Sequence, residues 1–479
     1  MESMHADSVL SKSEVQTFLD DAQKQLRQIL PGTSFAQRER AALAVANELV
    51  RGVLADELGE TAAGFGERVL VDGIEYKIHE NATVTYHGLS GPMDIPRATY
   101  RRTGVRNGPT VVPLELEAGL VERATPALAY SLAHGYAQHD MRLHGEILAA
   151  SHRHPPSRTT LERIAQRVAG RAVRSEARIE RALRRSESPP AEACAIVMGL
   201  DRTSTAMVET RAADAPAKPE VKRTKPRVRK PPAAFDINWR MAYVGTVSFV
   251  DERGDAVATV RYASPACDDP RSLVEHMTAD VKSALRRNPG LNVGIVQDGA
   301  HEMWNRTREG LQSLKNDGLL ASWEEGIDRY HLMERLADAL TLVEPNPIER
   351  RTVLDRWKEQ FDSRDSTIDS VQTYLTKAYD RLTDADARAK LDDHLGFIRR
   401  NKDRMRYVTL RLAHLPVGSG VTESAAKTVV ALRAKRSGQR WREESLRGVL
   451  TLRAIHQSDR LPGFWGHLAK GYTAHVVAA

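Results

Sequence analysis

The segment AEACAIVMGLD, residues 191–201, is a near-continuous apolar run that ends in an aspartate. A run of this kind is typical of a strand buried on both faces of a sheet. Two more strand-like segments follow, WRMAYVGTVSFVD at 239–251 and AVATVRYAS at 256–264, separated by the turn sequence ERGD. We therefore expect three consecutive strands in this part of the chain.

Helical and strand-like segments alternate beyond these three strands. Residues 269–289 have helical spacing, the apolar run that follows ends in Asp298, and ASWEEGIDRYH at 321–331 contains a shorter strand. Residues 332–414 are helical and highly charged. In the ribonuclease H-like fold, three strands are followed by a helix, a strand, a helix and a strand, and one more helix comes later in the chain. We therefore expect an α/β core of this kind with a helical insertion.

The chain before this core changes its pattern twice. Residues 11–57 have helical spacing, residues 68–104 alternate as a small antiparallel sheet does, and helices resume over 126–185. Before the core we expect a helical region at 1–65, a small β module at 66–108 and a helical region resembling a helix-turn-helix at 109–188. The first part of the core is expected at 189–340 and contains a basic Pro-rich loop at 212–234. A helical insertion at 341–410 follows, and the rest of the core with basic helices occupies 411–479.

Composition limits the class of protein. The chain has 479 residues, 70 Lys and Arg against 63 Asp and Glu, and a net charge of +7, so its basic excess is mild. Its two cysteines exclude a disulfide scaffold and a four-cysteine zinc site. The N-terminal residues do not resemble a signal peptide, and no apolar run is long enough to cross a membrane. We expect a cytoplasmic, nucleoid-associated protein without a membrane partner.

Two basic segments are candidate DNA contacts. In LHGEILAASHRHPPSRTTLERIAQRVAGRAVR, residues 143–174, Ser157 is a good cap for a second helix that opens with Arg158, Thr159 and Arg163. Helix-turn-helix modules present such side chains to base edges, and an ordinary helical hairpin with a solvated basic face is the equal alternative. In the linker APAKPEVKRTKPRVRKPPAA, the candidates for phosphate contacts are Lys222, Arg223 and Arg229, and a solvated loop is the plainer interpretation.

Three carboxylates are candidates for a metal site. Asp201 and Asp298 each end an apolar strand, and Glu423 stands in the first turn of a helix. Ligands usually bind beyond the carboxyl ends of strands in an open α/β sheet, and carboxylate oxygens suit Mg²⁺. Taken singly, each aspartate is also a good turn residue, and Glu423 also suits a helix start paired with Lys427. Asp328 is a less favoured rival, and His331 belongs either to the active site or to the core, of which we expect the core.

The helix that carries Glu423 lies within VGSGVTESAAKTVVALRAKRSG, residues 417–438. At 100° per residue, Val421, Ala425, Val429 and Leu432 form one stripe, and small or apolar residues also flank Glu423 on the other side. We therefore expect a largely buried helix, in which an acid needs a partner or a metal ion. The basic residues expected to follow a nucleic-acid backbone are Lys427, Arg433, Lys435, Arg436 and Arg440.

These segments together resemble a known family. VMGLD at 197–201, VGIVQDGAHEMW at 293–304, DRYHLMERL at 328–336 and the run from LPVGSG to PGFW at 415–465 look like the DDE transposases of bacterial insertion sequences, in particular the ISKra group. The Gly-Ser-Gly-x-x-Glu element with the following Lys, Arg-x-Lys-Arg-Ser-Gly and Arg-Trp is its specific part. The resemblance covers roughly residues 191–465.

The resemblance implies both a site and an activity. Asp201, Asp298 and Glu423 would form the metal-binding triad of an enzyme that uses two Mg²⁺ ions, with Mn²⁺ as a substitute. The family cuts double-stranded DNA at the terminal inverted repeats of the element and joins the freed 3′ hydroxyl to target DNA. We expect the protein to act on DNA as a homodimer or as a larger synaptic assembly.

The sequence also departs from this family. In the family, the strand region ahead of the helical block often carries a cysteine pair. The corresponding segment of this chain, RRTGVRNGPTVVPLE, contains no cysteine. Either this module is stabilised without a metal ion or its recognition of DNA ends differs, and neither case affects the triad. Independently of this departure, two alternative functions stay open, an idle relative that only binds DNA and a nuclease of the same fold that cuts without joining.

Overall fold

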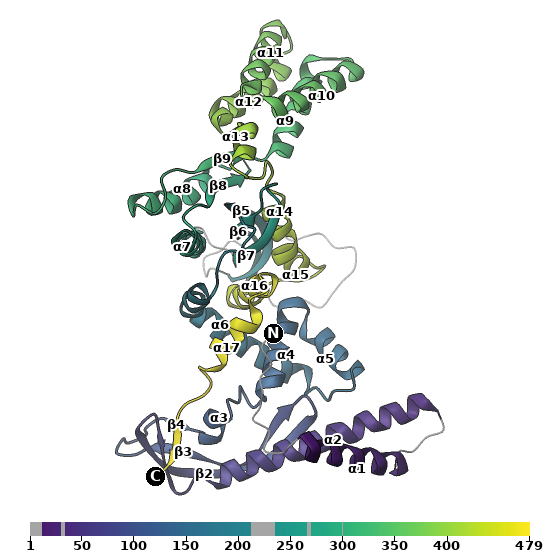
Figure 1. Cartoon of the computed structure of the whole chain (residues 1–479), viewed down its shortest axis with the longest axis vertical. Coiled ribbons are helices and arrows are strands. Elements are labelled where there is room, and N and C mark those ends of the chain that lie inside the picture. The colour runs from purple at the N-terminus through teal and green to yellow at the C-terminus, as the bar shows by residue number, and fades with distance from the viewer. Residues whose placement is uncertain (1–11, 30–33, 212–234, 266–269, 299) are drawn as a thin grey trace, which may run out of the picture. The chain divides into compact units, whose positions relative to one another are not determined.

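The computed structural model describes residues 12–29, 34–211, 235–265, 270–298 and 300–479. The chain has an α/β fold and divides into two compact units, residues 1–168 with 469–479, and residues 169–468. Over the described residues, each unit contains one five-stranded sheet (Figure 1). In this part of the chain, no helix combines the length and the apolar character needed to cross a membrane.

The first unit combines helices with an antiparallel sheet in the order β10-β1-β2-β3-β4. The strands are β1 (Arg68–Val71), β2 (Ile74–Gly88), β3 (Gly91–Arg102), β4 (Thr110–Val111) and β10 (Val476–Ala478). The helices are α1 (Lys12–Ile29), α2 (Phe35–Ala63), α3 (Pro113–Glu117), α4 (Pro126–Gln138) and α5 (Met141–Ala150). The small antiparallel sheet predicted from the alternating pattern is confirmed.

The outer strand β10 belongs to a different region from the one we expected. Val69 pairs with Ala478 and Val71 with Val476, so the last residues join the first sheet. We had assigned residues 411–479 together to the core. A three-residue strand has too short a pattern to indicate which sheet it joins.

The second unit contains a mixed sheet in the order β7-β6-β5-β8-β9. Strands β5 (Ala195–Thr210), β6 (Phe235–Val250) and β7 (Ala256–Ser264) are antiparallel, whereas β8 (Asn292–Gln297) and β9 (Glu324–Ile327) run parallel to β5. Helices α7 (Arg271–Arg287) and α8 (His301–Asn316) separate the strands from β7 to β9. The order of elements predicted from 191 to 331 is therefore confirmed, although β5 continues nine residues beyond the expected end at Asp201.

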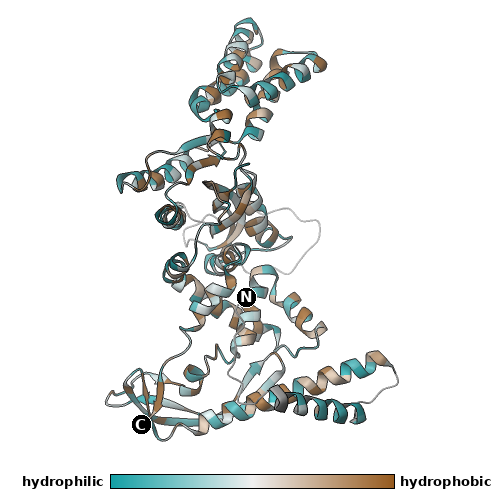
Figure 2. Ribbon diagram, in the orientation of Figure 1, coloured by the Kyte–Doolittle hydropathy of each residue, from teal (hydrophilic) through white to brown (hydrophobic). Residues whose placement is uncertain are grey.

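Helices make up most of the rest of this unit. They are α6 (Arg158–Ser186, which begins in the first unit), α9 (Arg329–Val343), α10 (Pro347–Ser363), α11 (Thr367–Arg381), α12 (Ala385–Asn401), the 3-10 turn η1 (Lys402–Arg404), α13 (Tyr407–Leu412), α14 (Gly420–Ala425), the π-helical turn η2 (Ala426–Ala431), α15 (Leu432–Ala434), α16 (Glu443–Gln457) and α17 (Leu461–Ala469). Helices α9 to α12 carry both hydrophobic and hydrophilic residues, as amphipathic helices do (Figure 2). Helices α10 to α12 lie within residues 341–410, where we predict a helical insertion, whereas most of α9 precedes this stretch.

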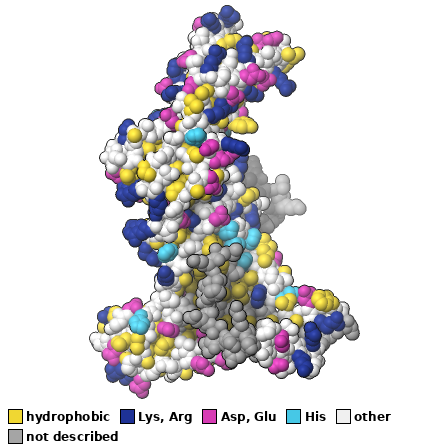
Figure 3. Space-filling view, in the orientation of Figure 1, with side chains coloured by type: hydrophobic (Ala, Val, Ile, Leu, Met, Phe, Trp, Pro, Cys, Tyr) yellow, Lys and Arg dark blue, Asp and Glu magenta, His cyan; other side chains and the backbone are white. Residues whose placement is uncertain are grey.

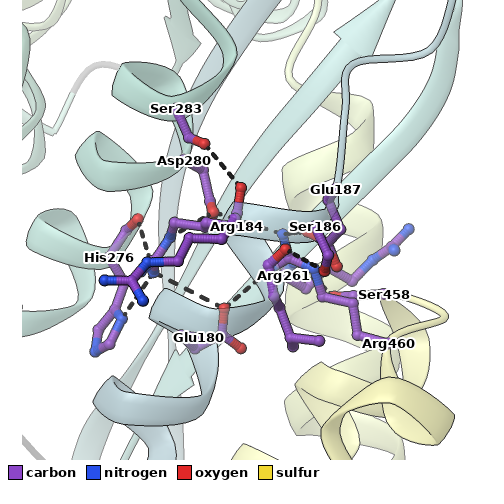
Figure 4. Close-up of polar contacts among 12 residues, drawn as sticks. Glu180, Arg184, Ser186, Glu187, Arg261, His276, Asp280, Ser283, Ser458 and Arg460 are labelled. Atoms are coloured by element: carbon purple, nitrogen blue, oxygen red, sulfur yellow. Dashed lines mark hydrogen bonds and ion pairs between the residues drawn. The ribbon is translucent and has the colours of Figure 1, made fainter. Parts of the chain in front are cut away.

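A buried ionic network connects α6 to α7 and to the residue just before α17 (Figure 4). Arg184 Nε of α6 donates to Asp280 Oδ1 of α7 at 2.8 Å. Arg460, just before α17, donates to Glu180 of α6 at 3.0 Å and lies 3.5 Å from Asp280. The Tyr262 hydroxyl of β7 contacts both carboxylates, at 3.0 Å to Glu180 and 2.6 Å to Asp280. Glu180, Asp280 and Arg460 are almost fully buried and Arg184 is largely so, and each charge therefore depends on its partners.

Candidate functional site

Three aspartates align across the parallel part of the second sheet. Ala195 of β5 pairs with Asn292 of β8, and Gln297 of β8 pairs with Ile327 of β9. Asp201 stands six residues after Ala195, and Asp298 stands six residues after Asn292. Likewise, Asp298 directly follows Gln297, and Asp328 directly follows Ile327. Neighbouring strands lie about 4.8 Å apart, so the same register brings these aspartates to one level where β8 and β9 end.

Helix α14 is held against β5 and β6 by a close approach. A side chain at Gly199 of β5 would overlap the Thr422 hydroxyl of α14. Thr422 Oγ1 lies 2.7 Å from Thr246 Oγ1 of β6, and both threonines are buried. Only glycine leaves room for this contact, which brings Glu423, the next residue of α14, to the level of the aspartates.

Replacing Gly199 by alanine is expected to lower the free energy of unfolding of this unit by about 1–3 kcal/mol, because the new methyl group must displace α14. All six tryptophans lie in residues 169–468, so their fluorescence in a urea titration follows this unit alone. Gly466→Ala in α17 is the control, since, apart from the chain neighbours and the backbone of its own helix, no atom of the described residues lies within 4 Å of the added methyl group. Equal stability of the two variants would contradict the close-approach argument.

The helix that contains Glu423 departs from the regular spacing that we assumed. A π-helical turn, η2, follows α14 directly. Val430 within this turn and Arg433 and Ala434 after it are buried, whereas Leu432 is 60% exposed. The stripe predicted through Leu432 is therefore wrong at its end. π-Helical turns shift the helical phase and are frequent at functional sites.

Arg433 is a correction to the predicted DNA contacts. Its side chain is 3% exposed and its guanidinium lies 4.9 Å from the centre of the Trp441 ring. Trp441 in turn donates from Nε1 to the carbonyl of Ala434 at 3.0 Å. Arg433 therefore packs inside the unit, and we remove it from the set expected to follow a DNA backbone.

All three predicted acids line one cavity of about 370 Å³. Asp201, Asp298 and Glu423 share its wall with His331 and with the basic residues Lys427 and Lys435. His331 therefore faces this cavity, with a side chain that is 44% exposed, and our expectation of a core position was wrong. The cavity combines acidic ligands with cations at its margin.

Each of these acids keeps one oxygen available. Asp201 Oδ1 accepts from the backbone N–H of Arg202 at 2.7 Å. Asp298 Oδ1 accepts from the N–H of Ala300 at 2.9 Å. Glu423 Oε1 accepts from Ser419 Oγ at 2.9 Å. Among the described residues, the second oxygen of each carboxylate has no hydrogen-bond donor.

The electrostatics of the cavity reflect crowded negative charge. Burial raises the pKa of Asp201, and the nearby carboxylates of Asp298 and Glu423 raise it further, while the backbone N–H of Arg202 and the charge of His331 act in the opposite direction. Crowding of this kind is costly unless a cation compensates it. Three open carboxylate oxygens around one polar cavity therefore fit Mg²⁺, which prefers such ligands.

A more compact group of possible ligands lies beside the predicted triad. Over the described residues, Asp328, His331 and Glu423 have ligand atoms that all lie within 4.8 Å of one another. Both oxygens of Asp328 are already used, however. Oδ1 accepts from the N–H of His331 at 2.9 Å, and Oδ2 accepts from the backbone N–H of Ser419, whose hydroxyl oxygen also lies 2.8 Å from it. Asp328 therefore serves as an internal acceptor and has no open oxygen like those of the triad.

The other predicted DNA contacts have different surroundings. Lys435 donates to Thr203 Oγ1 at the cavity, and Arg436 and Arg440 are exposed. Arg158 pairs with Glu162 at 2.8 Å and Arg163 with Glu122 at 2.6 Å, while Thr159 is exposed. Their helix, α6, is 29 residues long, so it is not a short recognition helix. The predicted contacts in the Pro-rich loop lie outside the described residues: Lys222, Arg223 and Arg229.

A larger cavity of about 710 Å³ lies beside the ionic network and has different chemistry. Its charged lining includes Arg184, Asp280 and Arg460, which pair with one another. The carboxylates of Glu187 and Asp280 in this lining are bound by Arg460 and Arg184, whereas the smaller cavity gathers three carboxylates with open oxygens, so the smaller cavity is the better candidate for a metal site. On the face displayed in Figure 3, Lys and Arg are interspersed with Asp and Glu.

Sequence reasoning missed Ser419, which contacts two of the acids here. The only signal was its place in the VGSG element before the helix. Comparison with known proteins adds no further assignment, since the chain matches no protein-family model and no curated protein.

Proposed function

We propose that this chain is a DDE transposase, in which Asp201, Asp298 and Glu423 hold two Mg²⁺ ions within a ribonuclease H-like core. The observation that carries the proposal is that these acids come from three separate segments and line one cavity, each with an open carboxylate oxygen. The order of elements from β5 to β9, followed by the helical stretch and α14, supports the proposed core.

The described residues have distinct parts in this chemistry. When bound, Mg²⁺ supplies Lewis-acid stabilisation of phosphate charge and lowers the pKa of the attacking hydroxyl. Trp304 Nε1 donates to the carbonyl of Asp298 at 2.6 Å and so fixes the position of that residue. Lys427 and Lys435 lie where a phosphate that enters the cavity would meet positive charge.

Two successive reactions at one site follow from the proposal. In the first, water attacks a phosphorus atom at the end of the element, the bond to the 3′ oxygen breaks, and that oxygen leaves as a hydroxyl. In the second, this hydroxyl attacks a phosphorus atom of target DNA, so one phosphodiester bond forms as another breaks. The expected partners are double-stranded DNA and at least one more copy of the chain, because two ends must be handled together.

The test is incubation of the whole protein with Mg²⁺, a labelled duplex that carries the terminal repeats, and a target plasmid. Cleavage at the repeat end followed by joining supports the transposase. Cleavage without joining would favour a nuclease of the same fold. Binding without cleavage, with Mg²⁺ or Mn²⁺, would favour an idle relative. A duplex with scrambled repeats measures how much depends on end recognition.

Replacing Lys427 and Lys435 together by glutamine is expected to weaken DNA binding equally for repeat and scrambled duplexes. Each lysine that neutralises a phosphate releases about one counterion, so the slope of log affinity against log salt should fall by about 2. Fluorescence anisotropy from low to moderate salt measures it. Lys377→Gln with Lys390→Gln, two exposed lysines on α11 and α12, removes the same charge away from the cavity. A loss confined to the repeat duplex would mean that the two lysines read bases.

A further inference from the structure

We propose that Asp328 is a positioning residue, which acts through Ser419 to orient the carboxylate of Glu423 in the cavity. This proposal rests on the proposed function, since it concerns how the same site binds a divalent cation. It assigns the compact group formed by Asp328, His331 and Glu423 to a supporting role and not to a second set of ligands.

Asp328 has the contacts of a fixed acceptor. Its side chain is almost fully buried at the junction of β9 and α9. One oxygen caps α9 by accepting from the N–H of His331, and the other accepts from the N–H of Ser419. Two backbone donors from separate segments therefore hold this carboxylate in a defined orientation.

The loop before α14 is thereby attached to the end of β9. The N–H of Arg329, next to Asp328, donates to the carbonyl of Val417 at 2.9 Å. A side chain at Gly418 would lie 3.3 Å from Asp328 Oδ2, so the loop passes close to the carboxylate. Val417, Gly418 and Ser419 are therefore held at both ends by residues 328 and 329, immediately before the helix that carries Glu423.

Ser419 transmits this placement to Glu423. Its hydroxyl oxygen lies 2.8 Å from Asp328 Oδ2 and 2.9 Å from Glu423 Oε1. The serine is 6% exposed, so it has little access to water as an alternative partner. Because the N–H of Ser419 is bound to Asp328 Oδ2, the hydroxyl is held in front of Glu423 Oε1 and its one proton is available to that oxygen. The opposite oxygen of Glu423 is then the one left open.

Substitution of Asp328 by asparagine should break this chain of contacts. The amide has one acceptor oxygen, which the cap of α9 requires, so its NH₂ group would face the backbone N–H of Ser419, a second donor, and would push the loop away. The Ser419→Ala variant removes only the hydroxyl and keeps the loop backbone. Ser419→Thr keeps a hydroxyl at the same place. Partners that orient a metal ligand typically contribute about 10–100-fold to metal affinity.

The experiment measures Mn²⁺ binding to the full chain without DNA, by electron paramagnetic resonance of the free ion, so it does not depend on catalysis. We expect Asp328→Asn and Ser419→Ala to weaken Mn²⁺ binding by about 10–100-fold, and Ser419→Thr to restore most of the affinity. Asp365→Asn is the matched control. Asp365 accepts from the N–H groups of Val408 and Thr409 and from the Thr409 hydroxyl, near α13, and does not line the cavity.

The outcomes separate this proposal from the proposed function. If the wild type does not bind Mn²⁺ more tightly than Asp298→Asn does, the proposed metal site fails and the positioning role fails with it. If binding depends on Asp298 but Ser419→Ala binds as tightly as the wild type, the metal site stands and the positioning role is overturned. If Asp328→Asn does not fold, the two Ser419 variants decide the question.

Discussion

Replacing Asp298 by asparagine is expected to reduce Mg²⁺-dependent cleavage of repeat-bearing DNA by more than about 100-fold, since even indirect partners of a metal ligand contribute about 10–100-fold. The amide keeps the shape of the side chain and can still accept from the N–H of Ala300. It removes the negative charge and the open carboxylate oxygen on which the proposed site depends. The initial rate of strand cleavage on a labelled duplex measures the effect.

Asp317→Asn is the control for this substitution. Asp317 also lies near an end of α8, but it is exposed and pairs with Lys282 at 2.6 Å. Its replacement should leave cleavage unchanged. DNA binding by Asp298→Asn should stay close to that of the wild type, which would exclude misfolding as the cause. Full cleavage activity in Asp298→Asn would refute the assignment of the triad.

The largest effect on stability is expected for Arg460→Met. Arg460 is 9% exposed and contacts Glu180, Glu187 and Asp280. Methionine fills much of the same volume but leaves buried carboxylates with only Arg184 to compensate them. Removing one partner of a buried ionic group typically costs about 3–5 kcal/mol. Tryptophan fluorescence during urea unfolding reports this loss, because all six tryptophans lie in this unit.

An exposed ion pair of the same unit provides the comparison. Arg399 of α12 pairs with Asp392 at 3.0 Å, and more than half of each side chain is exposed. Arg399→Met should therefore change the free energy of unfolding by at most about 1 kcal/mol. Similar losses in the two variants would mean that burial adds little to the network. A stabilised Arg460→Met protein would contradict the argument outright.

The strands of the second sheet were predictable because their apolar runs are long and are bounded by turn residues. Asp201 and Asp298 could be named as candidates because each stands at the end of such a run, but the runs alone did not distinguish them from turn residues, and the resemblance was needed to prefer them as a triad with Glu423. The extent of β5 could not, because its second half is stabilised by β6 and its apolar pattern is weaker there. Pairing with a distant segment decided where that strand ends.

The helix of Glu423 marks another limit of sequence analysis. Its burial was predicted, but the phase of its last turns was not, because the π-helical turn is not encoded in the apolar spacing. For this reason Leu432, which was expected to be buried, is exposed, and Arg433, which was expected to contact DNA, is buried. Asp298 and Asp328 both follow strands, so the sequence does not distinguish them. Both oxygens of Asp328 are occupied by the N–H groups of His331 and Ser419, and Ser419 lies 91 residues away in the chain.

The pairing of β1 with β10 bears on how the protein is made. Val71 cannot meet Val476 until residues 72–475 have been synthesised, so the first sheet gains its outer strand last. Until then, the edge of β1 presents unpaired backbone groups that another strand can use. Residues 169–468 can complete their own sheet earlier. Nascent and truncated chains are therefore the species most exposed to aggregation through this edge, and a chaperone that shields β1 would act during translation.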